Sequence, residues 1–161
     1  MGGNSFVAQF FALKIWDRDR TEISPSAIPV LAALDGLKGA IVSIDAIAIN
    51  AAIANVIRDA GADYLFAVKA NQPTLRAEIE RYFDDAPADR LDSFGDLDKA
   101  HGRIKERTVT VSREAGWLEG QRRFPGELRL PGATTIVRVN SRTGLKDRSR
   151  FDSRYFIAPP R

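Results

Sequence analysis

Asp45 stands where a carboxylate could do chemistry. It lies at the end of a short apolar run, residues 39–46, which is rich in β-branched side chains and is typical of a buried strand. A carboxylate there would lie at the carboxyl edge of the sheet, where open α/β folds hold their functional groups. The alternative is that Asp45 caps the loop or helix that follows.

A second polar group follows a second apolar run, residues 64–68. Lys69, Asn71 and Gln72 come directly after that run and before a Pro-Thr pair that opens a helix. In a parallel sheet these residues and Asp45 share one edge. They could hold a ligand, or they could turn the chain and cap the next helix.

The elements that must position these residues alternate along the chain. Helical spacing of apolar residues predicts helices at residues 25–34, 49–60 and from Pro73 to about residue 83, and strands are expected at 5–13, 39–46 and 64–68. Short links between strand, helix and strand favour parallel pairing through right-handed crossovers. The sequence therefore predicts an α/β fold whose mixed sheet has parallel central strands and flanking helices.

Beyond residue 83 the pattern changes. Residues 84–100 are acidic and contain Pro, Gly and Ser, which predicts an exposed loop, and residues 113–132 show no clear period. Strands are expected at 107–112, 134–140 and 154–157, as a small β-rich C-terminal part. Repeats are absent, so residues 1–161 are expected to form a single domain.

Composition and charge limit the classes of function. The sequence contains no cysteine, which excludes disulfides and thiolate metal sites, and it shows neither a secretory signal nor an apolar run of membrane-spanning length, so we expect a cytoplasmic protein. The net charge of +3 combines an excess of five acidic residues in residues 1–100 with an excess of eight basic residues in 101–161. Such a basic half suits a phosphate backbone, although a solvated surface explains it equally well.

Several motifs in a fixed order resemble insertion-sequence transposases of the aspartate–aspartate–glutamate class, and most of all their H-repeat-associated (ISAs-type) group. The resemblance covers roughly residues 20–157. The motifs are Glu22-Ile23, Ala27-Ile28-Pro29, Leu37 to Ala46, Gly61-Ala62-Asp63-Tyr64, Val68-Lys69-Ala70-Asn71-Gln72, Leu75, Asp84-Asp85, His101-Gly102-Arg103-Ile104 and Arg154-Tyr155-Phe156-Ile157.

This resemblance implies a ribonuclease-H-like fold in which three acidic side chains hold two Mg²⁺ (or Mn²⁺) ions for DNA strand cleavage and transfer. Asp45 matches the second acid of that set and would be both catalytic and a metal ligand. The first acid belongs upstream of residue 5, and the third belongs to a helix after residues 154–157. Glu106 could be offered as a substitute, but the family's glutamate in that segment aligns with Lys105. The resemblance thus implies a truncated catalytic domain, inactive alone.

The resemblance also implies DNA, the ends of an insertion sequence, as the partner. Lys69, Asn71, Gln72, His101 and Arg103 are then the candidates for contacts with phosphates or base edges. The alternative is a non-catalytic remnant that binds DNA non-specifically through basic loops, which hold Arg122, Arg123, Arg142, Lys146, Arg148 and Arg150. An unrelated nucleotide-binding domain is disfavoured because no Gly-rich phosphate loop follows a strand. Sheet edges and faces left uncovered by truncation would favour a homo-oligomer.

Overall fold

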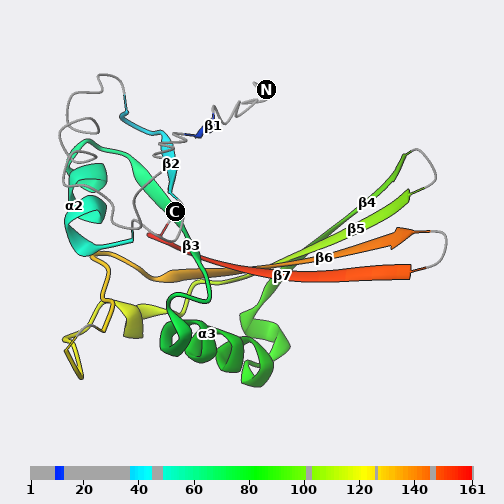
Figure 1. The fold of residues 1–161 in the computed structure, drawn as a ribbon. Coiled ribbons are helices and arrows are strands. Elements are labelled where there is room, and N and C mark those ends of the chain that lie inside the picture. Colours follow the sequence, from blue (N-terminus) through cyan, green and yellow to red (C-terminus); the bar gives the residue numbers. More distant parts are fainter. Residues whose placement is uncertain are drawn as a thin grey trace.

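The computed structural model describes residues 10–12, 37–44, 49–100, 103–125, 127–145 and 148–160. Within these ranges the chain forms a mixed sheet of seven strands in the spatial order β1-β2-β3-β7-β6-β5-β4 (Figure 1). The elements are β1 (Phe10–Ala12), β2 (Ile41–Ile44), α2 (Ala51–Asp59), β3 (Asp63–Val68), α3 (Pro73–Asp85), η2 (Ala88–Arg90), β4 (Asp92–Ala100), β5 (Arg103–Ser112), η3 (Gly116–Leu118), β6 (Thr135–Leu145) and β7 (Arg148–Ala158). The expected α/β class is confirmed.

Strands β1, β2 and β3 are parallel, as their short helical links predict. Helix α2 connects β2 to β3 and begins at the N-cap Asn50, whose side-chain oxygen accepts the backbone N–H of Ile53 at 2.9 Å. Its buried residues lie at helical spacing, so one face of the helix enters the core. The helix expected at residues 25–34 lies outside the described residues.

Two glycines fix the turns at the amino-terminal ends of β2 and β3. Gly39 and Gly61 both have positive φ, +78° and +73°, which side chains with a Cβ rarely adopt. The backbone N–H of Gly39 donates to the carbonyl oxygen of Gly61 at 2.8 Å, and Asp63 donates in the same way to Ala40 at 2.9 Å. These bonds hold the two strands in register, so their carboxyl ends reach the same edge.

The four remaining strands are antiparallel and belong to the same sheet. Strand β7 pairs with β3 on one side and with β6 on the other, and the hairpins β6–β7 and β4–β5 complete the sheet. The expected mixed sheet is therefore confirmed, but its parallel strands lie at one end and not at the centre, and the β-rich C-terminal part continues the same sheet. β7 takes the middle position of the sheet. Its neighbour β3 lies about ninety residues earlier in the chain.

The prediction of an exposed loop at residues 84–100 is also wrong about the backbone conformation. Asp84 and Asp85 end α3, and residues 92–100 form β4, which pairs with β5 along its whole length. The exposure was predicted correctly, since residues 92–98 are all exposed. Gly and Asp have low β propensity, so this strand is imposed by pairing with β5 rather than by its own residues.

The core lies on one face of the sheet. The register places buried side chains of β2, β3, β6 and β7 on the same face, where α2, α3 and the segment around η3 pack against them. The largest fully buried side chains are those of Tyr64, Phe66, Ile53, Ile57, Ile79, Leu118, Leu130, Ile136 and Ile157. Within the described ranges no helix is long and apolar enough to span a bilayer.

Candidate functional site at the carboxyl ends of β2 and β3

Strand β2 leads the chain to Asp45. Its last residue, Ile44, pairs with Phe66 of the parallel β3, so the carboxyl ends of the two strands lie at the same edge, and Asp45 is the next residue in the sequence. Asp45 itself lies outside the described residues, as does His101. The role of Asp45 therefore stays a prediction, although the strand that precedes it has the expected place.

The segment after β3 forms a tight turn into α3. The backbone N–H of Gln72 donates to the carbonyl oxygen of Lys69 at 3.0 Å, and that of Arg76 donates to Gln72 at 3.0 Å. Lys69 and Asn71 are exposed, whereas Gln72 is half-buried. Gln72 takes the N-cap position without a side-chain cap bond, and within the described residues its buried Oε1 has no hydrogen-bond partner. The expected turn is confirmed, the expected cap by the Gln72 side chain is not formed, and contact with DNA stays a prediction.

Tyr155 packs beside this edge because it pairs with Val68, the last residue of β3. The Arg76 guanidinium lies 5.6 Å from the centre of its ring, and Arg76 Nε donates to Glu80 Oε1 at 2.9 Å. Burial, followed by the negative charge of Glu80, raises the pKa of the Tyr155 phenol. The contact between Arg76 and the Tyr155 ring holds α3 against β7 near this edge.

No metal centre is formed by the described part of the chain, in which no group of three or more His, Asp or Glu side chains lies close enough to hold an ion. Glu80 and Asp152 are instead paired with Arg76 and Arg154. Asp45 offers the hard oxygen ligand that Mg²⁺ prefers, but a single carboxylate does not make a two-ion site.

Two residues that the sequence offered as candidates for DNA contact or catalysis lie away from this edge. Glu106 and Arg103 belong to β5, from which β2 is separated by β3, β7 and β6. Arg103 begins β5 next to Ala100, at the outer end of the β4–β5 hairpin. The structure therefore does not bring Arg103 together with Lys69, and it places Glu106 far from the end of β2.

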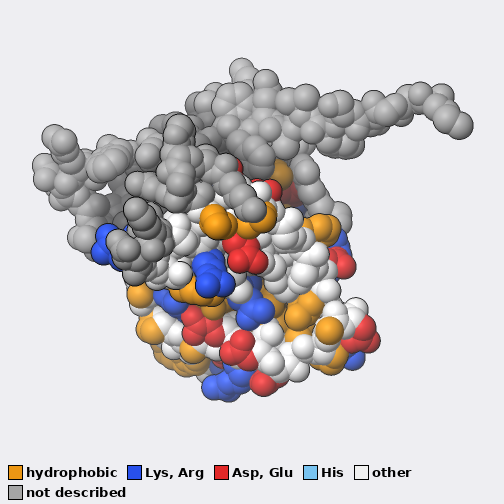
Figure 2. Space-filling model, turned by 90° about the vertical axis from the view of Figure 1, so that its right-hand side faces the viewer, with side chains coloured by type: hydrophobic (Ala, Val, Ile, Leu, Met, Phe, Trp, Pro, Cys, Tyr) orange, Lys and Arg blue, Asp and Glu red, His pale blue; other side chains and the backbone are white. Residues whose placement is uncertain are grey.

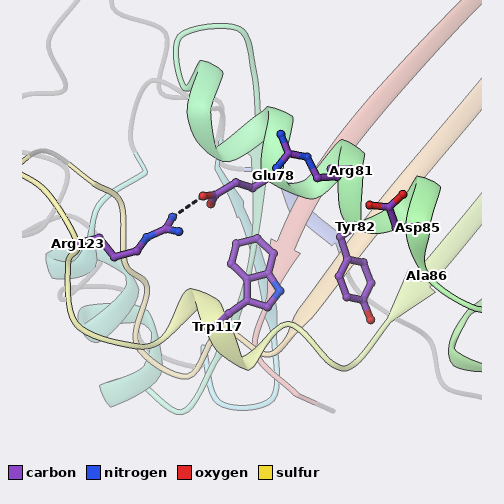
Figure 3. A pocket seen from close by; sticks show the side chains of 7 residues that line it. All are labelled: Glu78, Arg81, Tyr82, Asp85, Ala86, Trp117 and Arg123. Carbon is purple, nitrogen blue, oxygen red and sulfur yellow. Dashed lines mark hydrogen bonds and ion pairs between the residues drawn. The ribbon is translucent and has the colours of Figure 1, made fainter.

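A groove of about 440 Å³ lies between α3 and η3 (Figure 3). It is lined by Glu78, Arg81, Tyr82, Asp85, Ala86, Trp117 and Arg123, and the indole of Trp117 points toward α3. Two acidic and two basic side chains line the groove, so its charge is balanced and does not select an anion. The ion pair between Glu78 and Arg123 crosses one end of it.

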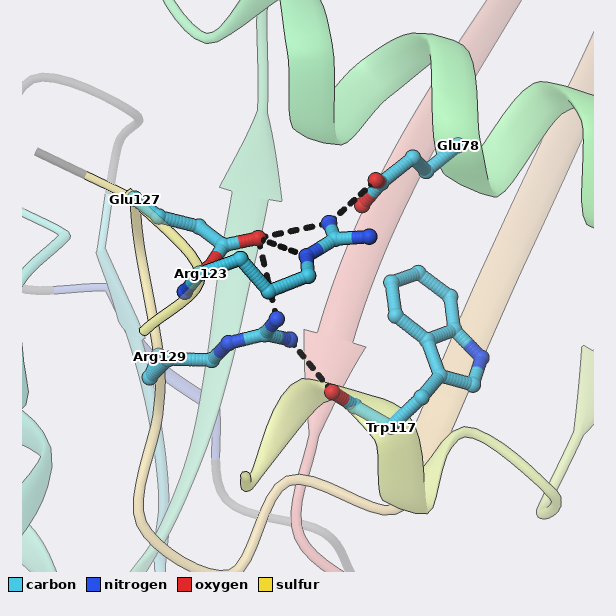
Figure 4. Close-up of polar contacts among 5 residues, drawn as sticks. All are labelled: Glu78, Trp117, Arg123, Glu127 and Arg129. Carbon is cyan, nitrogen blue, oxygen red and sulfur yellow. Dashed lines mark hydrogen bonds and ion pairs between the residues drawn. The ribbon is translucent and has the colours of Figure 1, made fainter. Parts of the chain in front are cut away.

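Next to this groove, Glu127 joins the irregular segment to α3 (Figure 4). Its carboxylate accepts the backbone N–H and the Nε–H of Arg123, both at 2.6 Å, and Nη2 of Arg129 at 2.9 Å. Arg123 also pairs with Glu78 of α3, and Arg129 donates to the carbonyl oxygen of Trp117. This cluster was not predicted, because its one local signal in the sequence is the spacing of four between Arg123 and Glu127.

On the face shown in Figure 2, the described side chains do not form a continuous basic surface. Seen from the side toward which the outer ends of β4–β7 point, basic, acidic and hydrophobic side chains are interspersed (Figure 2). Many arginines of the basic half of the chain have acidic partners, including Arg113 with Asp92 and Arg138 with Asp84. Arg142, Arg148 and Arg150 lie in strands β6 and β7, where basic loops were expected, and Lys146 lies outside the described residues.

Comparison with known proteins finds related sequences. No family model matches this chain, and no solved structure matches it. An uncharacterized protein from the dhlA 3′ region of Xanthobacter autotrophicus is 37% identical over 134 residues, which cover 82% of this chain and 43% of that protein. The H repeat-associated putative transposase YbfD of Escherichia coli K12 is 38% identical over 97 residues, 59% of this chain and 38% of the relative. A putative transposase YncI from Escherichia coli O157:H7 is 39% identical over 92 residues, 54% of this chain and 23% of the relative.

These names support a transposase family, which confirms the resemblance inferred from the motifs at that level. The chain spans less than half the length of each of these curated relatives.

Proposed function

We propose that this chain forms part of the catalytic domain of a metal-dependent DNA transposase of the H-repeat-associated, ISAs-type group, with a ribonuclease-H-like core. The observation that carries the proposal is the parallel pairing of β2 and β3: Asp45 follows the last residue of β2 in the sequence, and the turn from Lys69 to Gln72 follows β3. Relatives named putative transposases over more than half of the chain support it.

In this proposal Asp45 supplies one carboxylate oxygen ligand of a Mg²⁺ or Mn²⁺ site, and the metal, when bound, activates the attacking hydroxyl and stabilises the leaving oxygen at phosphorus. Lys69 and Asn71 are exposed next to that edge and would position the DNA backbone. The resemblance assigns the other two acids to segments outside these 161 residues. We therefore expect the chain by itself to lack cleavage activity.

The second candidate is a domain that binds DNA without catalysis through its basic half. The ion pairs of Arg113, Arg123, Arg129 and Arg138 weaken this candidate, because they offset charge that would otherwise face phosphates. The two candidates differ at Asp45, which the non-catalytic interpretation does not need.

The test is Mn²⁺ binding by the 161-residue chain, followed by electron paramagnetic resonance, with Asp45→Asn compared with Asp89→Asn. Asp89 is an exposed acid of η2 and serves as the matched control for loss of one negative charge. With one carboxylate of the set we expect weak Mn²⁺ binding by the wild type, its loss in Asp45→Asn while circular dichroism shows an intact fold, and wild-type binding in Asp89→Asn. Unchanged binding in Asp45→Asn, or loss of the fold, would overturn the assignment of Asp45 as a ligand.

A further inference from the structure

The outer halves of β4–β7 form an arm that extends past the helices (Figure 1), and we define it as residues 95–98, 104–108, 140–144 and 149–153. The strand register assigns its side chains to two faces. On the face that carries the core, α3 covers the sheet only as far as the row that holds Arg138 and Tyr155. The Arg138 guanidinium lies 4.9 Å from the centre of the Phe83 ring, and Arg76 covers Tyr155.

Farther out along the arm than α3 reaches, the same face carries first a row of polar side chains and then rows with exposed apolar side chains. The polar row contains Ser153 and Asn140, which are joined by a hydrogen bond of 2.9 Å. In the next rows the side chains of Phe151, Leu97 and Ile104 are 71%, 57% and 50% exposed. Three large apolar side chains this exposed on one sheet face indicate an interaction surface, because single apolar residues are normally scattered.

Across the four strands, two charged side chains lie between two apolar ones. In order from β4 to β7, one row reads Leu97, Glu106, Arg142 and Phe151. Glu106 and Arg142 are both exposed, and neither has an ion pair among the described residues. Because the row has the order apolar, acid, base, apolar, its reversed copy is complementary to it.

We propose that this face of the arm binds a second copy of this chain, face to face, about a two-fold axis that runs parallel to the strands between β5 and β6. Such an axis keeps each row at its level and reverses the strand order, so Leu97 faces Phe151 of the partner and Glu106 faces Arg142. Aligned packing of two sheets is a common arrangement. Each dimer then contains two symmetric Glu106–Arg142 pairs, as an isologous interface requires.

The next row fits the same axis. Ile104 lies opposite Gly144 of the second copy, and in the free chain a hollow of about 260 Å³ is lined by Ile104, Glu106, Arg142, Gly144 and Ser149. A Cβ added at Gly144 would meet the Ile104 carbonyl oxygen at 3.7 Å, an ordinary contact, so packing within one chain does not require this hollow. The side chain of Ile104 from the second copy would enter it.

Duplex DNA is a poorer occupant for this face. By strand register the two outer rows hold two basic residues, Lys99 and Arg142, which are too few to follow a phosphate backbone, and Glu106 beside Arg142 would repel phosphates. The interface is independent of the proposed catalytic role, because none of its residues lies at the end of β2.

The test is sedimentation equilibrium of the 161-residue chain from about 1 µM to several hundred micromolar. The variants are Glu106→Arg, Arg142→Glu and the two together, and Arg107→Glu on the opposite face is the control for charge reversal in β5. We expect a wild-type dimer, a dissociation constant raised about tenfold or more by either single reversal, and recovery in the double variant. The control variant should dimerise as the wild type does.

A wild-type chain that stays monomeric over this range would overturn the proposal, and so would a double variant that fails to recover. Association that requires added duplex DNA would assign the face to nucleic acid instead. Circular dichroism verifies the fold of each variant, and Phe151→Ser, which changes no charge, should weaken the dimer as well.

Discussion

Lys69 and Lys38 carry the same charge at opposite ends of the parallel strands. Lys69 follows β3 at the proposed DNA edge, whereas Lys38 is an exposed residue of the turn that precedes β2. We expect Lys69→Ala to weaken binding of short duplexes equally for all sequences and to reduce the slope of log affinity against log salt by about 1.

Fluorescence anisotropy across a salt series measures this slope, and Lys38→Ala is the control, which should leave it unchanged. An equal effect of both variants would show that binding depends on net charge and not on this edge. Affinity that persists at high salt would contradict a phosphate contact altogether.

At the scale of single residues, the sequence predicts features that depend only on residues close by in the chain. The turn from Lys69 to Gln72 and the helix after residue 49 follow from Pro73 and from apolar spacing, which need no distant partner, although the N-cap at Asn50 was not predicted. The partners of Glu127 could not be predicted in this way, because Glu78 comes from α3, almost fifty residues earlier, and Arg123 lies in a segment without periodicity.

At the scale of elements, Glu127 stabilises the contact between the irregular segment and α3. Burial opposes the charged form of Glu127, but the Arg123 backbone N–H and guanidinium, together with the charge of Arg129, outweigh it and lower the pKa below its ordinary value of 4.5. A group with a lowered pKa stabilises the fold above its unfolded-state pKa, and the contribution is lost as the pH falls through the folded-state value.

We therefore expect Glu127→Gln to lower the free energy of unfolding clearly at pH 7 and to differ less from the wild type as the pH falls below 4.5. Urea denaturation at several pH values measures both effects. Glu114→Gln is the control, because Glu114 pairs with Arg90 at 3.1 Å where both side chains are about half exposed, and such pairs contribute little. A difference that grows toward acid pH would contradict the role of Glu127.

Strand β4 shows where prediction of elements from sequence fails. Its residues, with Asp92, Gly95, Asp96 and Asp98, have the composition of a loop, and its strand conformation comes from pairing with β5. Strands β2 and β3 were predicted because buried parallel strands read as continuous apolar runs. Exposure of the acidic residues of this strand was predictable from their polarity, whereas the exposure of Phe94 and Leu97 was not.

At the scale of the whole molecule, the β3–β7 pairing joins the parallel and antiparallel parts into one sheet. Three residue pairs make this junction, and Ile157 lies within it between Phe66 and Ile136, fully buried. No sequence period encodes the junction, because it depends on which distant strands meet. The two parts therefore share one core, and we expect them to unfold together.

We expect Ile157→Val to lower the free energy of unfolding by about 0.5–1.5 kcal/mol, because it removes one buried methyl group at this junction. Native-state hydrogen exchange should show equal loss of protection for β2 amides on one side and β6 amides on the other, since a shared core opens as one unit. Ile41→Val makes the same change at a half-buried site in β2 and should cost less. If protection fell in β6 and stayed unchanged in β2, the two parts of the sheet would be separate folding units, and β7 would not join them energetically.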